Sequence, residues 1–175
     1  MNIEIRKLDP REYKGHKFTV RYVTDRIYDV KLLDGGFRLV LNECEPTEKG
    51  FSDSLFEDWL EAPIAYGAFR NGRLIGFVEG SRESWHDVFR ISNVFVEDGE
   101  RGRGIGTRLM EYIIDAARES GEYRAVMLET QSCNYPAICM YKKLGFTLCR
   151  IDIGEYSNND VENREVRIDL ILKLR

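Results

Sequence analysis

The chain has 175 residues, of which 43% are hydrophobic and 32% charged, and its net charge at pH 7 is −4. This length and balance predict one globular domain over residues 1–175, and the lack of a basic excess argues against a nucleic-acid-binding protein. No apolar run approaches the roughly 20 residues of a spanning helix, and the N-terminal segment is too charged for a signal peptide. We therefore expect a cytoplasmic protein that has neither nucleic acid nor membrane as a partner.

The cysteines and histidines do not follow the spacing of a metal site. The chain has four cysteines and only two histidines, and no two cysteines form a CxxC pair. A structural zinc site places its ligands closer together, so we predict no bound metal. The sulfur atoms are expected to be free thiols, buried or half-exposed, in a reducing compartment. They belong to Cys44, Cys133, Cys139 and Cys149.

The first half of the chain is predicted to consist mostly of strands. In chain order, alternating apolar residues and turn signals predict strands over 18–22, 26–33 and 36–41, a short helix over 52–63, a hairpin over 65–80 and a strand over 88–96. Asp34-Gly35 and Asn71-Gly72 are typical of hairpin turns. The helix is expected to stop at Pro63.

The second half is predicted to mix helices and strands. They are a helix over 105–120, a strand over 125–130, a helix over 135–144 and strands over 146–153 and 166–174. Gly121 is expected to end the first helix and Asn134 to cap the second. The buried face of the first helix is predicted to hold Ile105, Leu109, Tyr112, Ile113 and Ala116. The order predicts a mixed α/β sheet with helices on its faces. The last strand is expected either to belong to the monomer's own sheet or to pair with a strand of a second copy in a homodimer.

The stretch RGRGIG, residues 101–106, comes between a strand and a helix. The first N–H groups of a helix have no partner within it, and a glycine-rich approach lets them reach a phosphate. Arg101 and Arg103 can add positive charge to the same anion. A Walker A loop is excluded because no lysine precedes Thr107, and a dinucleotide fingerprint is excluded because Leu109 stands where it needs glycine. The stretch therefore predicts a pyrophosphate site, and the alternative is a turn without a ligand.

RGRGIG also fits the R/Q-x-x-G-x-G/A pattern of the GNAT acyl-CoA N-acyltransferases, at Arg101, Gly104 and Gly106. The stretch NYPAICMYKKLGF, residues 134–146, resembles the N-x-x-A-x-x-x-Y-x-x-x-G-F segment of the same family. The resemblance covers residues 64–150 and implies a mostly antiparallel central sheet with helices on both faces. The segments LETQ at 128–131 and YSNND at 156–160 are similar to the streptothricin acetyltransferase branch of the family.

The resemblance implies acetyl transfer from acetyl-CoA to an amine by direct attack in a ternary complex. It implies that the backbone of the strand before RGRGIG binds pantetheine, that one of its amides polarises the thioester carbonyl, and that the loop binds pyrophosphate. Asn134 would hold pantetheine near the thioester. The implied cofactor-binding residues are Val94, Phe95, Val96, Arg101, Gly102, Arg103, Gly104, Ile105, Gly106, Thr107 and Asn134.

Attack requires a neutral amine, whereas a lysine-type amine has a pKa near 10.4 and is protonated at neutral pH. The resemblance makes Tyr141 the acid that protonates the leaving thiolate. Many relatives carry a carboxylate on the strand before the loop, where this chain has Ser92 and Asn93. Glu129 is therefore expected to serve as the base or to bind a cation, with Glu79 as the second candidate. Either carboxylate can equally be a surface residue.

The acceptor is expected to be a primary amine of a small cationic molecule, in particular a streptothricin-like antibiotic. An amine of a protein or peptide is the first alternative. A CoA-binding module without transfer activity is the second. Trp59 and Trp85 either line a substrate site or pack in the core or at its rim, and packing is the expectation.

Overall fold

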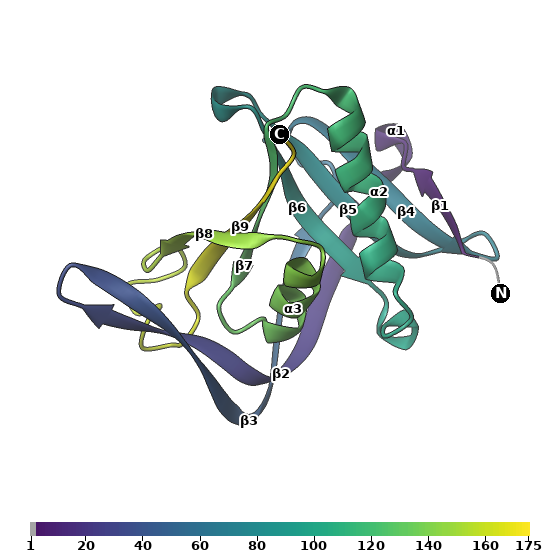
Figure 1. Ribbon diagram of the computed structural model, residues 1–175. Helices are drawn as coiled ribbons and strands as arrows, with labels where there is room; N and C mark the ends of the chain where they lie inside the picture. Colours follow the sequence, from purple (N-terminus) through teal and green to yellow (C-terminus); the bar gives the residue numbers. More distant parts are fainter. Residues whose placement is uncertain (1–2) are drawn as a thin grey trace. The chain divides into compact units, whose positions relative to one another are not determined.

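Figure 1 shows a computed structural model of the protein, which describes residues 3–175. Its strands are β1 (Glu4–Lys7), β2 (Lys17–Leu33), β3 (Gly36–Ser54), β4 (Glu61–Arg70), β5 (Arg73–Glu83), β6 (Val88–Val96), β7 (Ala125–Gln131), β8 (Thr147–Asp152) and β9 (Arg167–Lys173). Its helices are α1 (Pro10–Tyr13), α2 (Ile105–Ser120) and α3 (Tyr135–Lys143), with 3-10 turns η1 (Ser84–His86) and η2 (Asp98–Glu100).

Seven strands form one sheet in the order β1-β4-β5-β6-β7-β9-β8, and β2 pairs with β3 in a separate sheet. The β6–β7 pair is parallel, whereas β1–β4, β4–β5, β5–β6 and β8–β9 are antiparallel. The expected mixed, mostly antiparallel α/β sheet is thus confirmed. β9 lies between β7 and β8, so the last strand belongs to the monomer's own sheet.

The chain divides into two compact units, and β2, β3, β7 and β9 each contribute to both. The first unit comprises the chain up to Phe18, Ser52–Leu128 and Leu172–Arg175, and the second comprises Thr19–Phe51 and Glu129–Ile171. The strand and loop predicted to bind the cofactor's pantetheine and pyrophosphate belong to the first unit. The predicted side chains Glu129, Asn134 and Tyr141 belong to the second.

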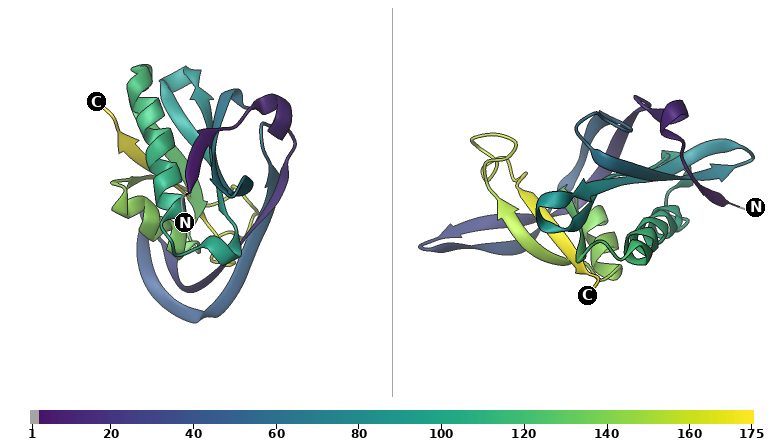
Figure 2. Two further views of the ribbon diagram at one scale, coloured as in Figure 1. Left: turned by 90° about the vertical axis from the view of Figure 1, so that its right-hand side faces the viewer. Right: turned by 90° about the horizontal axis from the view of Figure 1, so that it is seen from above.

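The core of the first unit lies between α2 and the strands β4, β5 and β6, along which α2 runs in Figures 1 and 2. On the opposite face of these strands, Phe77 is fully buried, and the rings of Phe18 and Phe95 lie 4.8 and 5.2 Å from its centroid. Next to it, a Cβ on Gly76 would lie 2.8 Å from the Phe95 carbonyl oxygen. Glycine at this position therefore lets β5 and β6 approach closely beside the aromatic stack.

Both predicted hairpin turns are confirmed. Asn71 and Gly72 join β4 to β5 with φ angles of +50° and +78°, the left-handed pair that a two-residue turn of this kind requires. Asp34 and Gly35 join β2 to β3, and Gly35 has a φ of +79°. Figure 2 shows β2 and β3 as one long, curved hairpin.

The helix predicted over residues 52–63 is wrong. Ser52 to Ser54 complete β3, and a turn follows in which Phe56 has a left-handed φ of +57°. The backbone here is bonded to distant segments, Leu55 N to the His16 carbonyl at 3.1 Å and Phe56 N to a Glu79 carboxylate oxygen at 2.6 Å. Contacts distant in sequence therefore override the local capping signal.

The helix after the glycine stretch is confirmed over Ile105–Ser120, and Gly121 ends it with a φ of +68°. Its buried face is rotated from the predicted one. Tyr112 is 46% exposed and Ala116 half-buried. The residues that α2 buries are Ile105, Leu109, Met110, Ile113, Ile114 and Ala117. No helix among residues 3–175 is both long and apolar enough to cross a membrane.

The second unit has its own buried side chains. Ile138 and Tyr141 of α3 are buried, as are Ile168 and Leu170 of β9. The predicted cap of α3 is confirmed, because the Asn134 side chain accepts a hydrogen bond from Ala137 N at 3.3 Å. The cysteines are free thiols as expected. The exception to the predicted burial is Cys149, which is exposed.

Candidate functional site

β6 carries a bulge in the middle of its pairing with β5. Glu79 is paired with Asn93 and Gly80 with Ile91, so Ser92 is the additional residue. The parallel pairing of β6 with β7 runs from Val88 to Ile91 and ends just before this bulge. Bulges are frequent next to active sites because they redirect backbone and side-chain groups. The bulge thus lies two residues before the predicted pantetheine-binding segment.

The segment Val94–Val96 is half-buried and completes β6. The Phe95 ring is stacked on Phe77, with an interplanar angle of 29°, which fixes the strand laterally. The Val96 carbonyl accepts a hydrogen bond from Arg101 Nε at 3.0 Å. One of the backbone groups assigned to the cofactor therefore also tethers the loop that follows.

The RGRGIG stretch forms a bare turn into α2. Gly102 and Gly104 have φ angles of +74° and +76°, a conformation that L side chains rarely adopt, and a Cβ on either would meet no atom within 4 Å. Gly104 is the N-cap of α2 without a side-chain cap, and its carbonyl receives the first helical hydrogen bond, from Arg108 N. The N–H groups of residues 105–107 therefore head the helix without acceptors in it, which suits a phosphate.

The two arginines of this loop lie beside carboxylates. Arg101 Nη2 is 3.0 Å from Asp98, and Arg103 Nε is 3.8 Å from Glu100. Glu100 is 8% exposed and also accepts a hydrogen bond from Arg70 at 2.5 Å. The sequence analysis did not find Glu100 and Arg70, since only the fold brings position 70 to this loop.

Glu79 is fully buried in the first unit, so the interpretation as a surface residue is wrong for this carboxylate. One oxygen accepts the N–H of Phe56 at 2.6 Å, and the other accepts Asn93 Nδ2 at 2.9 Å. Ser92 Oγ lies 3.5 Å from the second oxygen. Burial raises the pKa of Glu79 above its ordinary value, although the hydrogen bonds from Asn93 and Phe56 oppose the shift.

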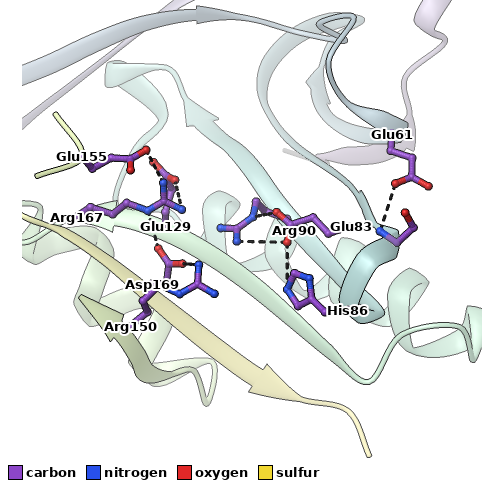
Figure 3. A network of polar contacts seen from close by, with 10 residues as sticks. Glu61, Glu83, His86, Arg90, Glu129, Arg150, Glu155, Arg167 and Asp169 are labelled. Carbon is purple, nitrogen blue, oxygen red and sulfur yellow. Dashed lines mark hydrogen bonds and ion pairs between the residues drawn. The ribbon is translucent and has the colours of Figure 1, made fainter. Parts of the chain in front are cut away.

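Glu129 lies at the end of β7 in the second unit, and its side chain is 37% exposed. Figure 3 shows Arg167 joined to Glu129, Glu155 and Asp169. The distance from Arg167 Nη2 to Glu129 Oε2 is 2.9 Å, and that from Nη1 to Glu155 Oε1 is 2.7 Å. Glu129 is thus one arm of an ion-pair network, and the sequence analysis missed the arginine at its centre.

Gln131, the last residue of the LETQ segment, joins a second polar chain in this unit. It accepts a hydrogen bond from the Tyr22 hydroxyl at 2.8 Å and donates one to Glu165 at 2.6 Å. Lys49 Nζ lies 2.7 Å from the other oxygen of Glu165. Burial raises the pKa of Tyr22. These partners come from β2, β3 and the loop before β9, so no spacing along the chain could reveal them.

Tyr141 is 8% exposed on α3, and its ring lies 6.2 Å from that of Phe146. Burial raises the pKa of Tyr141 to about 12, so the phenol holds its proton at neutral pH. Asn134 uses its side-chain oxygen to cap α3. Its NH2 group is a separate donor that can face a ligand.

The two tryptophans of the first unit do not pack in its core. Trp59 is 70% exposed and Trp85 is 75% exposed, which excludes packing in the core and leaves a place at its rim or in a substrate site. Trp59 belongs to the turn that Glu79 fixes through Phe56. Trp85 lies in η1, next to His86.

A bulged strand that leads into a bare glycine loop and a helix, inside this mixed sheet, defines the class of acyl-CoA-dependent acyltransferases. Residues 33–146 match the acetyltransferase (GNAT) family. The chain is 32% identical to a streptothricin acetyltransferase of Escherichia coli over 144 residues, 82% of this chain and 80% of that protein. It is also 32% identical to a streptothricin acetyltransferase of Streptomyces lavendulae, over 81% of this chain and 79% of that one.

A crystal structure of nourseothricin acetyltransferase is also similar, with a TM-score of 0.77, 25% identity and coverage of 99% of both chains. The protein belongs to the GNAT family and is an acetyl-CoA-dependent N-acetyltransferase.

Proposed function

We propose that this enzyme transfers the acetyl group of acetyl-CoA to a primary amine of a small cationic molecule of the streptothricin type. The observation that carries the proposal is the 32% identity to two proteins named streptothricin acetyltransferase, over about four fifths of each chain. A similar solved structure is named nourseothricin acetyltransferase. The proposal treats residues 1–175 as one catalytic domain, and this structure's coverage of 99% of both chains supports it. Acetyl transfer of this type confers resistance to the acetylated antibiotic.

Acetyl-CoA is proposed to bind along the strand and loop of the first unit. Backbone groups of Val94, Phe95 and Val96 would bind pantetheine, and an amide of the same strand would polarise the thioester carbonyl. The N–H groups from Arg101 to Thr107 would bind pyrophosphate, which the left-handed glycines and the uncapped start of α2 support. The Asn134 NH2 group would contact pantetheine near the thioester.

The transfer is proposed to be direct. The amine nitrogen attacks the thioester carbon, the C–S bond breaks, and the CoA sulfur leaves as a thiolate that receives a proton from the Tyr141 hydroxyl. The retained proton of this buried phenol supports the acid role. Glu129 is proposed to contact the acceptor's ammonium group, as its counter-ion or as a base through water, and its partial exposure supports such contact.

The test is release of free CoA thiol from acetyl-CoA by the purified protein. Streptothricin, aminoglycosides, polyamines, free lysine and short peptides serve as acceptors. Rapid release with streptothricin or another small cationic amine supports the proposal, whereas release with peptides alone would assign the protein-amine alternative. If none of the amines causes release of the thiol, while acetyl-CoA still raises the melting temperature of the protein, the module without transfer activity is favoured.

The ternary mechanism has its own test. Incubation with acetyl-CoA alone should leave the mass of the intact protein unchanged, and initial rates should give intersecting double-reciprocal lines. An acetylated protein that then acetylates the amine would refute direct transfer.

The enzyme is proposed to act in the cytoplasm. Its four free thiols support a reducing compartment. Fractionation of the native host, with activity measured in each fraction, tests the location.

A further inference from the structure

The Glu79 carboxylate is enclosed in the first unit, and among residues 3–175 none of its hydrogen-bond donors is a cation. These donors are the Phe56 N–H, the Asn93 amide and, at longer distance, the Ser92 hydroxyl. The Asp53 carboxylate also acts on Glu79, and it disfavours the charge. Two other carboxylates of the first unit have an arginine partner: the half-buried Glu83 contacts Arg90 in Figure 3, and the buried Glu100 contacts Arg70.

A structural role alone does not require a charge at this place. Burying a carboxylate away from water is unfavourable unless it is paired. The uncharged amide of a glutamine could accept the hydrogen bond from Phe56 N with its oxygen and donate one to the Asn93 side-chain oxygen once that amide is turned, without the cost of a buried charge. A buried group with a raised pKa next to a bulged strand is typical of a functional proton acceptor.

The bulge places a half-buried hydroxyl beside this buried carboxylate. Ser92 is the additional residue of the bulge and is half-buried, whereas Glu79 is fully buried. The hydroxyl of Ser92 lies 3.5 Å from Glu79 Oε2, a long distance for a hydrogen bond. Hydrogen bonds used in catalysis are often long before substrate binds and shorten in the complex.

We propose that Glu79 accepts the proton of the acceptor amine through the hydroxyl of Ser92. One N–H bond of the bound ammonium group breaks and its proton passes to Ser92 Oγ, while the hydroxyl proton of Ser92 passes to Glu79 Oε2. The neutral amine then attacks the thioester carbon, and it loses a second proton to water as the amide forms. The CoA thiolate receives its proton separately, and Glu79 returns its proton to water by the same route. Glu129 is then the counter-ion of the ammonium group. This inference rests on the proposed function, which is acetyl transfer to an amine.

Three variants of the full chain test the relay with an acceptor that the wild type acetylates. Glu79→Gln keeps the shape and an oxygen acceptor for Phe56, Ser92→Ala removes the relay hydroxyl, and Ser92→Thr is the matched control that retains it. At pH 7, kcat/KM for the amine is expected to fall about 100- to 10,000-fold in the first two, a typical contribution of a proton acceptor. The threonine variant should stay within about threefold of the wild type. Acetyl-CoA affinity, measured by calorimetry, should be unchanged in all three.

The pH profile separates proton transfer from a purely structural role. Without the acceptor only the neutral amine reacts, so kcat/KM of Glu79→Gln should rise about tenfold per pH unit up to the amine's own pKa near 10.4. The kcat/KM of the wild type should reach its plateau at a lower pH. An analogue of the same amine with a lower pKa should recover most of the loss in both defective variants.

Wild-type rates and profiles in Glu79→Gln and Ser92→Ala would overturn the relay. If Glu79→Gln does not fold, Ser92→Ala decides, because its site is half-buried and loses only a hydroxyl. A wild type that acetylates no amine would overturn the proposed function itself, and the relay with it. Loss of kcat/KM in Glu79→Gln and Ser92→Ala, with the wild type and Ser92→Thr active, supports the relay.

Discussion

Gly104→Ala isolates the contribution of the left-handed turn that begins α2. Gly104 has a φ of +76°, and a Cβ there would meet nothing within 4 Å, so the substitution introduces conformational strain without a clash. For an L residue this conformation costs about 1–2 kcal/mol. For a chain of this size, a loss of that free energy of unfolding lowers the melting temperature by about 2–8 °C. If the turn relaxes instead, acetyl-CoA binding must restore it, and Kd rises by about 5- to 30-fold.

Thermal unfolding and calorimetric titration with acetyl-CoA measure the two effects of this substitution. Gly99→Ala is the matched control, because Gly99 lies in η2 just before the loop, also has open space for a Cβ, and does not have a left-handed φ. The control should match the wild type in both measurements. The reasoning would be refuted if Gly104→Ala kept both the melting temperature and the affinity of the wild type.

Three other substitutions probe the second unit. Tyr141→Phe should lower kcat about 10- to 1000-fold with acetyl-CoA affinity intact, and since burial raises the pKa of Tyr141 to about 12, the wild type should show no loss of this acid up to pH 10. Glu129→Gln should raise KM for a cationic amine about tenfold with a smaller change in kcat; an unchanged KM would exclude contact with the ammonium group. Asp29→Asn should lower the free energy of unfolding by about 1 kcal/mol at pH 7, because Arg164 holds the pKa of Asp29 below its usual range. That difference should vanish as the pH falls below the lowered pKa, in denaturant titrations at a series of pH values.

Local signals in the sequence were enough to predict most elements of the fold. The strand over 88–96 and the start of the helix at 105 agree with the structure because alternation, glycine and capping residues act within a few positions. The buried face of α2 was predicted about a quarter turn away. The periodicity of the apolar residues gives the spacing within a buried helix face. The strands against which the helix packs decide that Met110 is buried and Tyr112 is not.

The candidate site was less accessible to sequence reasoning. Family motifs identify the loop and Tyr141, yet the environment of each carboxylate depends on residues far along the chain. Glu79 is buried by a turn 23 positions before it, the same turn that displaced the predicted helix. Glu129 meets Arg167, which follows after α3, β8 and a polar loop. No local pattern reports either pairing.

The carboxylates beside the glycine loop bear on how acetyl-CoA binding responds to ionic strength. Asp98 is paired with Arg101, and Glu100 is shared between Arg70 and Arg103, so two carboxylates offset most of the positive charge of three arginines around the turn. The phosphate would then be held mainly by backbone dipoles at contact distance, and such short contacts are screened much less by salt than attraction between distant charges. We therefore expect the affinity for acetyl-CoA to change little with the salt concentration.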